Sequence, residues 1–460
     1  MNTPRVTVYV CSRNYGRYLQ TCLESLFRQS FADWELILID DASTDNTWSE
    51  AERLTAGQGG RVRLLRNPSP QGLRRNANQA IELARGEYIM RLDADDWLDE
   101  SALLVLLAYL DRHPEVAAVF PNWFWVDERG ALLGVEQRRL IRGEQGFLEL
   151  PFHGACTLVR RRALVAVGGY DPQHESLDGH ELWLKLQSRY PIGQVGTPLF
   201  FYRQHADSLS RNPERQIRSR QAIKRVTLER QPGALPCRVA AVLLAKNRYA
   251  EPWLNAGFRI GGRSLLVHAA ASALAARCVD SIWVSTDDPD LDCEGLDPSI
   301  GVLLRGEQAR AVSSGLRDVY ADVWQQLQAR LDPAPDIVVF LSVHTPLRSA
   351  ASIDETVHSL RLFPFDEVLS VRETHELHLR YGRNGLEALN AAQTAGVQAE
   401  RETLLTWTGA VHTVWREALL PGRLLRGRVG HVTCTRMESL RMKHPEERWL
   451  IEHELGRLAA

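Results

Sequence analysis

The sequence predicts an α/β fold with two domains, and two observations lead to this fold class. Short apolar runs alternate with helical patterns from the first residues onward, and the alternation starts again after residue 236. Continuous apolar strands that are separated by helices indicate a mostly parallel sheet that is covered on both faces. The chain has 460 residues, which is too long for a single hydrophobic core. We therefore expect two α/β domains of similar size.

The first half contains the elements of one such sheet. Its apolar runs predict buried strands at 5–10, 35–40, 62–65, 88–92 and 116–120. Apolar residues at helical spacing predict helices at 17–29, 46–55, 73–84 and 100–111. In sheets of this kind, ligands bind in the crevice beyond the carboxyl ends of the strands. Two acidic loops, DDASTDNT (40–47) and DADD (93–96), each follow a predicted strand and are therefore expected at this edge.

The second half begins after a polar, basic segment at 211–236, which ends in Pro232-Gly233 and Pro236. This segment predicts a charged helix followed by a linker. Beyond it, the pattern predicts strands at 237–245, 281–288, 336–342 and 367–371, and helices at 264–276, 313–329 and 350–360. The expected organisation is a first domain at 1–210, the helix and linker at 211–236, and a second domain at 237–460.

The composition excludes several classes of function. Charged residues make up 24% of the chain and the net charge is −2, so bulk charge attracts neither nucleic acid nor an anionic membrane. The longest apolar run, 102–110, is too short to span a bilayer. Seven cysteines without a Cys-x-x-Cys pair indicate reduced thiols. We expect a protein that is cytoplasmic or peripheral to the inner face of the membrane, without nucleic-acid partners or transmembrane segments.

The stretch GEYIMRLDADDWLDE (86–100) gathers carboxylates directly after a predicted strand. In an extended segment, residues i and i+2 point the same way, so Asp93 and Asp95 can address one ion together. Hard divalent cations such as Mg²⁺ and Mn²⁺ take oxygen ligands and commonly bridge one or two carboxylates to substrate phosphates. The alternative is that these acids cap a helix that begins near Asp99, because a helix N-terminus favours negative charge. The residues alone leave both interpretations open.

The order of motifs along the first half supplies a context for this stretch. VTVYVCSRNYGRYLQTCLESLFRQSFADWELILIDDASTDNT, followed by GLRRNANQAIELARGEYIMRLDADD, closely resembles the family-2 glycosyltransferases of GT-A fold. The resemblance spans about residues 5–210. It implies a Rossmann-like nucleotide-binding domain whose donor is a nucleotide-diphosphate sugar. It also implies a divalent cofactor, Mn²⁺ or Mg²⁺, on the donor's diphosphate.

The resemblance further implies a donor site. In the family, the first strand and the Asp after the second strand hold the base and ribose of the donor. An Arg-Asn pair after a glycine also contributes, for which Arg74 and Arg75 are alternatives, and an Asp-x-Asp pair binds the metal and the diphosphate. The matching positions are Cys11, Arg13, Asp40, Asp41, Arg74, Arg75 and Asp93 for the nucleotide sugar, and Asp93, Asp95 and His205 for the metal.

Three later segments extend the resemblance. ESLDGHELWLKLQ (175–187) looks like the family's acidic segment that supplies the catalytic general base, with Asp178 as the better match and Glu181 as the second. Taken by itself, Asp178 is also typical of a helix N-cap. FYRQHADSLS (201–210) resembles the family's closing Tyr-Arg-x-His segment, which implies that His205 lies near the metal or diphosphate. PFHGACTLVRRRALVAVGGYDP (151–172) resembles the border of the acceptor pocket, so His153 and Gly154 are expected to line it.

The second half resembles a different family. The stretch from VAAVLLAKNRYAEPWLNAGFRIGGRSLL through VSTDD (284–288) and TPLR (345–348) is similar to the cytidylyltransferases that activate sialic acids and related acidic sugars with CTP. Active members carry a glycine-rich basic loop after the first strand, where this chain retains only Lys246 and Arg248 as cations. The family's Asp-x-Asp metal pair falls on Arg441 and Lys443, which cannot ligate a hard cation. We therefore expect this domain to be degenerate, with these four residues as candidates for holding an acidic ligand.

These observations predict an inverting, metal-dependent glycosyltransferase that moves a sugar from a nucleotide diphosphate donor to an acceptor hydroxyl, in cell-surface glycan or protein glycosylation. UDP- and dTDP-linked sugars are the common family donors, and the acceptor is a glycan, a lipid-linked sugar or a protein. One alternative is a bifunctional enzyme that also makes a CMP-activated acidic sugar. The other is a non-catalytic scaffold that binds nucleotides or glycans. The second domain is also a candidate for pairing two copies of the chain as a homodimer.

Overall fold

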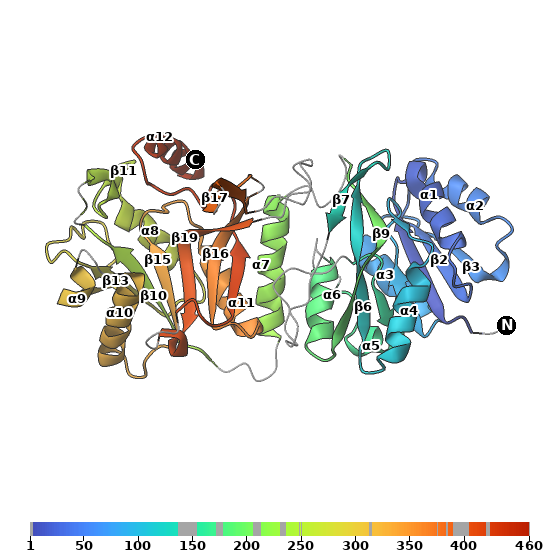
Figure 1. Cartoon of the computed structure of the whole chain (residues 1–460), viewed down its shortest axis with the longest axis horizontal. Coiled ribbons are helices and arrows are strands. Elements are labelled where there is room, and N and C mark those ends of the chain that lie inside the picture. Colours follow the sequence, from blue (N-terminus) through green and yellow to red (C-terminus); the bar gives the residue numbers. More distant parts are fainter. Residues whose placement is uncertain are drawn as a thin grey trace. The chain divides into compact units, whose positions relative to one another are not determined.

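The structure is a computed structural model (Figure 1), in which the chain forms two compact units. The first unit comprises Met1–Ser219 with Leu377–Glu402, and the second comprises Arg220–Glu376 with Thr403–Ala460. The residues that the structure describes are 3–136, 154–171, 178–205, 213–230, 236–247, 249, 251–311, 315–374, 376–382, 385–389, 404–419 and 424–459.

The first unit is built on a nine-stranded sheet. Its strands are β1 (Val6–Ser12), β2 (Trp34–Asp40), β3 (Val62–Arg66), β4 (Tyr88–Arg91), β5 (Trp97–Leu98), β6 (Ala118–Val126), β7 (Leu132–Glu136), β8 (Leu158–Arg160) and β9 (Ile192–Arg203). They lie in the order β3-β2-β1-β4-β8-β6-β9-β5, and β7 pairs with β6. The strands from β3 to β4 are parallel, whereas β8 is antiparallel to both of its neighbours.

Helices cover both faces of this sheet. They are α1 (Gly16–Phe27), α2 (Thr47–Thr55), α3 (Leu73–Leu83), α4 (Ala102–Arg112), α5 (Arg161–Ala166) and α6 (Asp178–Gln187), together with the 3-10 turn η1 (Gly59–Arg61). Because alternate residues of a strand point to opposite faces, β1 contributes to two cores. Val8 belongs to a cluster with Leu23 of α1 and Leu106 of α4, and Tyr9 belongs to another with Ala80 of α3. The predicted α/β class, with its sheet covered on both faces, is confirmed.

The second unit contains a seven-stranded sheet. Its strands are β10 (Val239–Ala245), β13 (Ser281–Thr286), β14 (Gly301–Leu304), β15 (Ile337–Ser342), β16 (Glu367–Thr374), β19 (Leu404–Trp415) and β20 (Val429–Thr433). The helices are α8 (Leu265–Leu274), α9 (Glu307–Arg310), α10 (Leu316–Arg330), α11 (Ala350–Leu362) and α12 (Glu447–Ala459), with the 3-10 turns η3 (Pro252–Leu254) and η5 (Arg416–Leu419). Two small hairpins complete the fold: β11 (Arg259–Ile260) with β12 (Arg263–Ser264), and β17 (Leu379–Gly382) with β18 (Gly385–Ala388), the latter grouped with the first unit.

The sheet of the second unit repeats the plan of the first. Its strand order is β14-β13-β10-β15-β19-β16-β20, which corresponds one to one with β3-β2-β1-β4-β8-β6-β9. The directions also correspond, because the first four strands are parallel, the next is antiparallel to both neighbours, and the last two are parallel to each other. The two units thus share one topology, although the sequence contains no residue-level repeat between them.

The basic helix between the two halves is α7 (Pro213–Glu229), and the division between the two units falls inside it, after Ser219. Lys224, in its second part, is fully buried, and its Nζ lies 3.0 Å from Glu355 Oε1 and 3.0 Å from Ser359 Oγ, both on α11. This part of the helix is therefore packed into the second unit. Among the described residues, no helix combines the length and apolarity needed for a membrane span.

A buried carboxylate, Glu35 on β2, ties three elements of the first unit together. Its Oε1 accepts hydrogen bonds from Thr7 Oγ1 and from the Arg85 N–H, each at 2.7 Å, and its Oε2 accepts one from Arg85 Nε at 2.7 Å. Burial alone would raise the pKa of Glu35, but these hydrogen bonds outweigh it and hold the pKa below its ordinary value. Glu35 therefore stabilises the folded state in its ionised form.

We expect Glu35→Gln to lower the free energy of unfolding by about 1–3 kcal/mol at pH 7, because Arg85 and Thr7 lose a charged acceptor. Since the folded-state pKa is depressed, this contribution is complete above the unfolded pKa of about 4.3 and is lost as the pH falls through the folded pKa. Urea unfolding followed by circular dichroism at pH 7 and at pH 3 measures the difference. An equal difference at both values would contradict the assignment.

Candidate active site at the carboxyl edge of the first sheet

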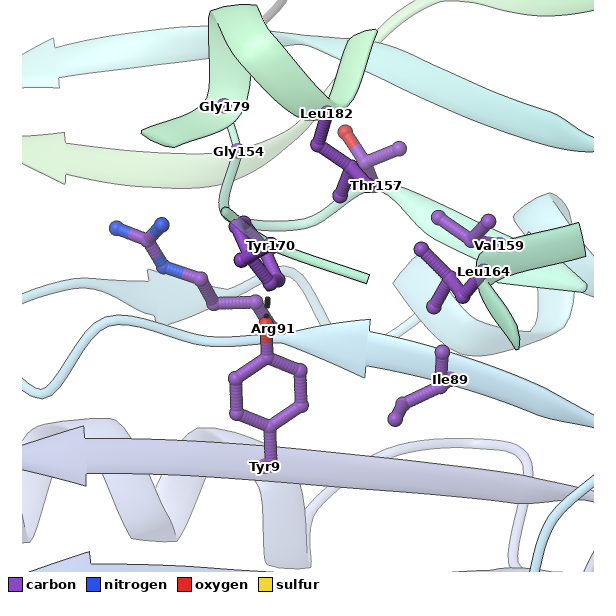
Figure 2. A pocket seen from close by; sticks show the side chains of 10 residues that line it. All are labelled: Tyr9, Ile89, Arg91, Gly154, Thr157, Val159, Leu164, Tyr170, Gly179 and Leu182. Carbon is purple, nitrogen blue, oxygen red and sulfur yellow. Dashed lines mark hydrogen bonds between the residues drawn. The ribbon is translucent and has the colours of Figure 1, made fainter. Parts of the chain in front are cut away.

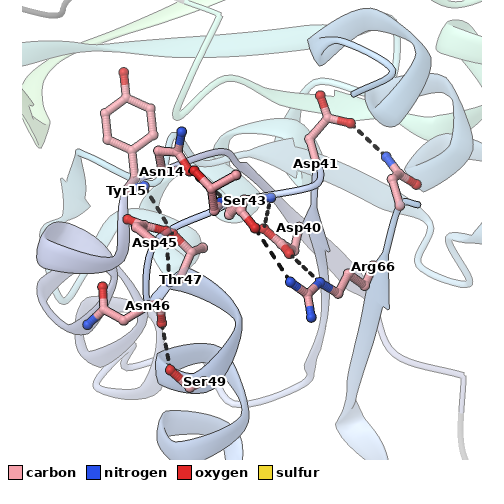
Figure 3. Close-up of polar contacts among 12 residues, drawn as sticks. Asn14, Tyr15, Asp40, Asp41, Ser43, Asp45, Asn46, Thr47, Ser49 and Arg66 are labelled. Atoms are coloured by element: carbon pink, nitrogen blue, oxygen red, sulfur yellow. Dashed lines mark hydrogen bonds and ion pairs between the residues drawn. The ribbon is translucent and has the colours of Figure 1, made fainter. Parts of the chain in front are cut away.

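The loops after β1 and β2 are tied to each other at the carboxyl edge of the first sheet (Figure 3). Asn14 Oδ1 accepts a hydrogen bond from the Thr44 N–H at 2.8 Å, and the Gly16 N–H donates to Asp45 Oδ2 at 3.1 Å. A Cβ at Gly16 would lie 2.2 Å from Asn46 Oδ1, so the start of α1 can approach this loop only as glycine. The two loops form one fixed wall of the site.

Asp40, the last residue of β2, has no exposed surface. Its Oδ1 accepts a hydrogen bond from the Ser43 N–H at 3.2 Å, and its Oδ2 lies 3.1 Å from Arg66 Nε (Figure 3). These contacts support the loop after β2, and a contact of Asp40 with the donor stays a prediction.

Asp41 holds the segment that leads into α3. Its Oδ1 accepts hydrogen bonds from the Gln71 N–H at 2.7 Å and from Asn67 Nδ2 at 2.8 Å, and its Oδ2 accepts one from the Gly72 N–H at 2.9 Å. Burial would raise the pKa of Asp41, but the hydrogen bonds from Gln71 and its neighbours hold the pKa below its ordinary value. Asp41 is thus an ionised carboxylate that fixes the beginning of α3.

The basic candidates at this edge differ in accessibility. Arg74 is only 7% exposed, and its Nη1 donates to the Asp171 carbonyl at 2.8 Å. Arg75 is exposed, as is Arg13 after β1, while Cys11 near the end of β1 is half-buried. Of the two alternatives at the start of α3, the accessible one is therefore Arg75, and Arg74 supports the packing.

Asp93 already has a cation beside it, because Arg91 at the end of β4 forms a bidentate ion pair with it. Arg91 Nε lies 2.5 Å from Asp93 Oδ1, and Arg91 Nη2 lies 2.9 Å from Oδ2. The Asp93 side chain keeps 20% of its surface exposed. Arg91 is not among the residues predicted for the site, although its i, i+2 spacing from Asp93 on an extended segment is a signal for this pairing.

Asp95 is paired differently, with His205. The Asp95 Oδ2 lies 2.9 Å from His205 Nε2, although the two residues are 110 positions apart in the chain. The imidazole is fully buried and faces the rings of Tyr15 and Tyr18 at centroid distances of 5.8 and 5.3 Å, whereas the Asp95 side chain is 16% exposed. The structure thus brings together the acid and the histidine that were predicted to lie near one metal.

The third carboxylate of this stretch, Asp96, points into the protein. It has no exposed surface, and its Oδ1 accepts a hydrogen bond from the Arg203 N–H at 2.9 Å. Burial, followed by the charges of Asp95 and Asp93, raises the pKa of Asp96 well above its ordinary value. Arg203 Nε also donates to the Asp95 carbonyl at 2.8 Å, so the end of β9 clamps the acidic segment. Neither Asp96 nor Arg203 is among the residues predicted for the site, because their burial and pairing depend on the contact between distant segments.

A small pocket lies beside Arg91 (Figure 2), and Gly154 and Gly179 are among its lining residues. Across it, the hydroxyls of Tyr9 and Tyr170 are 3.0 Å apart. A Cβ on Gly154 would lie 3.2 Å from Arg91 Nη1 and 3.7 Å from Gly179 Cα. The two glycines therefore let the first turn of α6 approach the Arg91–Asp93 pair closely.

Gly154, Asp178 and Glu181, three of the candidates for catalysis and acceptor binding, lie in or beside this turn. Helix α6 begins at Asp178, whose side chain lies outside the described residues, as does His153. Glu181 is 3% exposed, forms an ion pair with Lys185, and accepts the Asp171 N–H at 3.2 Å through Oε2. A general base must reach the acceptor hydroxyl, and the Glu181 carboxylate is instead buried and paired with Lys185. The assignment of the base to Asp178 or Glu181 stays a prediction.

The residues present fit a metal only if a substrate shares it. Among the described residues, no three His, Cys, Asp or Glu side chains converge as a metal centre. Asp95 and His205 nevertheless offer one carboxylate and one imidazole side by side. Divalent ions that bind together with a diphosphate commonly use only one or two protein carboxylates. The pair is therefore compatible with an ion that arrives with its substrate.

In the second unit, Lys246 and Arg441 are the two candidates whose surroundings meet, because Lys246 lies beside Tyr249 and the segment of Arg441 contacts His344, which faces the Tyr249 ring. Lys246 directly follows β10, and its Nζ lies 4.8 Å from the centre of the Tyr249 ring. Arg441 precedes a residue whose N–H donates to the carbonyl of His344, just after β15. Lys443 is exposed on the next part of this segment, and Arg248 lies outside the described residues.

The fold and the site together define a class of protein. A sheet with parallel strands, covered on both faces and lined at its carboxyl edge by polar loops, is the arrangement of nucleotide-binding α/β domains. Comparison with known proteins identifies the family, because residues 7–168 match the model of glycosyl transferase family 2. The N-terminal part of the chain is therefore a family-2 glycosyltransferase domain. The cytidylyltransferase resemblance of the second unit stays a prediction.

Several known proteins are similar to this chain over part of its length. The chain is 31% identical over 188 residues to the glycosyltransferase EpsE of Bacillus subtilis, an alignment that covers 40% of this chain and 66% of EpsE. It is 26% identical over 231 residues to the chondroitin synthase of Pasteurella multocida, covering 50% of this chain and 24% of that protein. The solved mannosyltransferase PcManGT of Pyrobaculum calidifontis, in complex with GDP-Man and Mn²⁺, is 19% identical with a TM-score of 0.43, covering 50% and 66%. The chain spans less than two thirds of the length of these relatives.

Replacement of Asp96 by Asn tests whether the raised pKa of Asp96 makes the stability of the protein depend on pH. Because the folded-state pKa of Asp96 lies above the unfolded value of about 3.9, the folded protein retains a proton that the unfolded chain releases. Wild-type stability should therefore fall as the pH rises from about 4 through the folded pKa, and the amide variant should escape this loss. We expect the stability of Asp96→Asn relative to wild type to increase between pH 4 and pH 8 in thermal unfolding. A relative stability that decreases over this range would contradict the buried, protonated state.

Proposed function

We propose that the first unit is an inverting, metal-dependent glycosyltransferase that moves a sugar from a nucleotide diphosphate donor to an acceptor hydroxyl. The observation that carries the proposal is the Asp95–His205 pair beside the Arg91–Asp93 pair, at the carboxyl edge of a family-2 domain. The product is proposed to be a cell-surface glycan, which is supported by relatives that include a chondroitin synthase and EpsE.

Donor binding is assigned to the accessible residues of the wall and of α3. Arg13 and Arg75 are exposed cations at the same edge of the sheet as Asp95, and a diphosphate carries the complementary charge. Asp41 supports Arg75 by fixing the first residues of α3. UDP- and dTDP-linked sugars are the proposed donors, by analogy with the family.

Asp95 and His205 would hold the divalent ion, which is proposed to be Mn²⁺ or Mg²⁺. When bound, such an ion acts as a Lewis acid that stabilises the negative charge developing on the departing diphosphate. Arg91 assists electrostatically, because it neutralises Asp93 and so reduces the repulsion between two adjacent carboxylates and an anionic donor. The same pairing keeps Asp93 oriented before the donor arrives.

The general base is proposed to be Asp178. It begins α6, and the close approach of Gly154 and Gly179 brings this turn beside Arg91 and therefore beside the donor's proposed position. The acceptor hydroxyl attacks the anomeric carbon from the face opposite the diphosphate, which inverts the configuration. Asp178 takes the hydroxyl proton as the new glycosidic bond forms and the bond to the diphosphate breaks.

Isothermal titration of the full chain with UDP, dTDP and GDP, with and without Mn²⁺, tests the donor site. We expect one nucleotide to bind in a manner that depends on Mn²⁺, and Asp95→Asn to weaken this binding about ten-fold or more, since a carboxylate ligand is lost. Asp33→Asn is a matched control, because Asp33 is exposed and precedes β2 at the opposite edge of the sheet. Equal binding by Asp95→Asn and wild type would contradict the metal assignment.

Kinetic and stability measurements distinguish the roles of Asp178 and Glu181, the two carboxylates of α6. We expect Asp178→Asn to slow release of the nucleoside diphosphate from the bound donor by about 10²–10⁴-fold while leaving donor affinity unchanged, as loss of a general base would do. Glu181→Gln should instead lower thermal stability, because it breaks a buried ion pair with Lys185. If Glu181→Gln loses turnover at unchanged stability and Asp178→Asn keeps it, the base has been assigned to the wrong residue.

A further inference from the structure

A short segment between α5 and α6, Gly169–Asp171, is held by side chains of two helices. Every backbone group from the Gly169 carbonyl to the Asp171 carbonyl forms a hydrogen bond with a side chain of α3 or α6. Buried backbone groups need partners, and outside regular structure these are commonly other backbone groups or water. Here the partners make the segment, which we call the brace, a link between α3 and α6.

Asn78 on α3 forms two of these hydrogen bonds. Its Oδ1 accepts the Tyr170 N–H at 2.8 Å, and its Nδ2 donates to the Tyr170 carbonyl at 2.8 Å. Arg74, four residues earlier and therefore on the same face of the helix, donates to the Asp171 carbonyl at 2.8 Å. Gly169 has a φ of +61°, and a Cβ on it would lie 2.5 Å from Asn78 Oδ1. The brace can therefore approach Asn78 this closely only with glycine at this position.

Glu181 and Lys185 form the hydrogen bonds from α6. Glu181 Oε2 accepts the Asp171 N–H at 3.2 Å, and Lys185 Nζ donates to the Gly169 carbonyl at 2.9 Å. The two side chains also form an ion pair with each other. Because Glu181 lies within one helical turn of Asp178, where α6 begins, these contacts fix the beginning of the helix.

The side chain of Tyr170 connects the brace to the sheet. Tyr170 is 4% exposed, and its hydroxyl lies 3.0 Å from that of Tyr9 on β1. Its ring lines the same pocket as Gly179 and Leu182 of α6 (Figure 2). The brace therefore places the first turn of α6 relative to both the sheet and α3.

The beginning of α3 belongs to the proposed donor site. Asp41 accepts the N–H groups of Gln71 and Gly72, which precede the helix, and Arg75 is the accessible cation of its first turn. The hydrogen bonds of Asn78 go to the brace and not to any described residue that is assigned to the donor or the metal. A change at Asn78 should thus leave the donor contacts in place.

We propose that Asn78 is a positioning residue for the transfer reaction: it fixes the brace against α3, and the brace sets the place of the turn that begins with Asp178. The inference rests on the proposed function, because it takes Asp178 as the general base. Without the amide, the Tyr170 N–H and carbonyl lose their partners, and the brace must shift to recover hydrogen bonds. A displacement of about 1 Å at a reacting group can slow a reaction about 10²-fold.

Hydrolysis of a sugar nucleotide by the full chain with Mn²⁺ tests the proposal, with UDP-glucose, UDP-N-acetylglucosamine, dTDP-glucose and GDP-mannose as donors. Water then takes the place of the acceptor hydroxyl: it attacks the anomeric carbon, the bond to the diphosphate breaks, and Asp178 takes the proton. We expect Asn78→Ala to lower kcat about 10- to 100-fold and to leave the donor KM within about two-fold of wild type. Alanine favours the helix, so α3 stays formed.

Gln79→Ala is the matched control, because Gln79 is the next residue of α3 and is likewise half-buried. A double-mutant cycle, measured with enzyme in excess over donor, separates positioning from a general loss of stability. If Asn78 acts through the turn of Asp178, Asn78→Ala should slow Asp178→Asn no further. Thermal unfolding of each variant shows that the measured protein is folded.

The outcomes distinguish this proposal from the proposed function. If wild type hydrolyses a donor and Asn78→Ala keeps its kcat, raises only KM, or slows Asp178→Asn by the same factor as wild type, the proposal for Asn78 is overturned and glycosyl transfer stands. If wild type hydrolyses none of the donors, the proposed function fails and the role of Asn78 fails with it.

Discussion

Burying parallel strands between two layers of helices leaves only the edges of a sheet for polar chemistry. Every residue of β2 is buried, and the same holds for nearly all of β1 and β10. Backbone N–H and C=O groups inside the sheet are hydrogen-bonded to neighbouring strands, so a ligand can be recognised only by the loops that leave the strands. In the first unit, the candidate ligand-binding residues that follow β1, β2 and β4 therefore lie at the carboxyl edge.

The residues that follow corresponding strands differ between the two units. After β4 the first unit places Asp93 and Asp95, and after β15 the second unit places His344, with Arg441 beside it. Two unit charges about 4 Å apart interact by about 4 kcal/mol near a protein surface, so a few substitutions in these loops change which ligands the edge can hold. One topology can thus serve two ligand chemistries, because the scaffold does not depend on the loops.

Much of the first site is organised before any ligand binds. Asp41 fixes the start of α3, Arg91 holds Asp93, and Arg203 clamps the acidic segment against β9. Such fixed groups reduce the ordering that binding would otherwise require. The arrangement has a cost at Asp96, because burial and the charges of Asp95 and Asp93 raise its pKa well above the ordinary value.

The sequence by itself determined the α/β class, the main strands and helices of both halves, and the position of the acids after β2 and β4, because hydrophobic periodicity and the order of strand and loop are local properties. The tertiary structure alone decided the partners of these acids. Arg91 pairs with Asp93 at close range, whereas His205 reaches Asp95 from 110 positions away, and Asp96 is fully buried although Asp95 beside it is not. The shared topology of the two units was visible only in the strand pairing. Backbone hydrogen bonds can form the same strand order in two domains whose side chains differ.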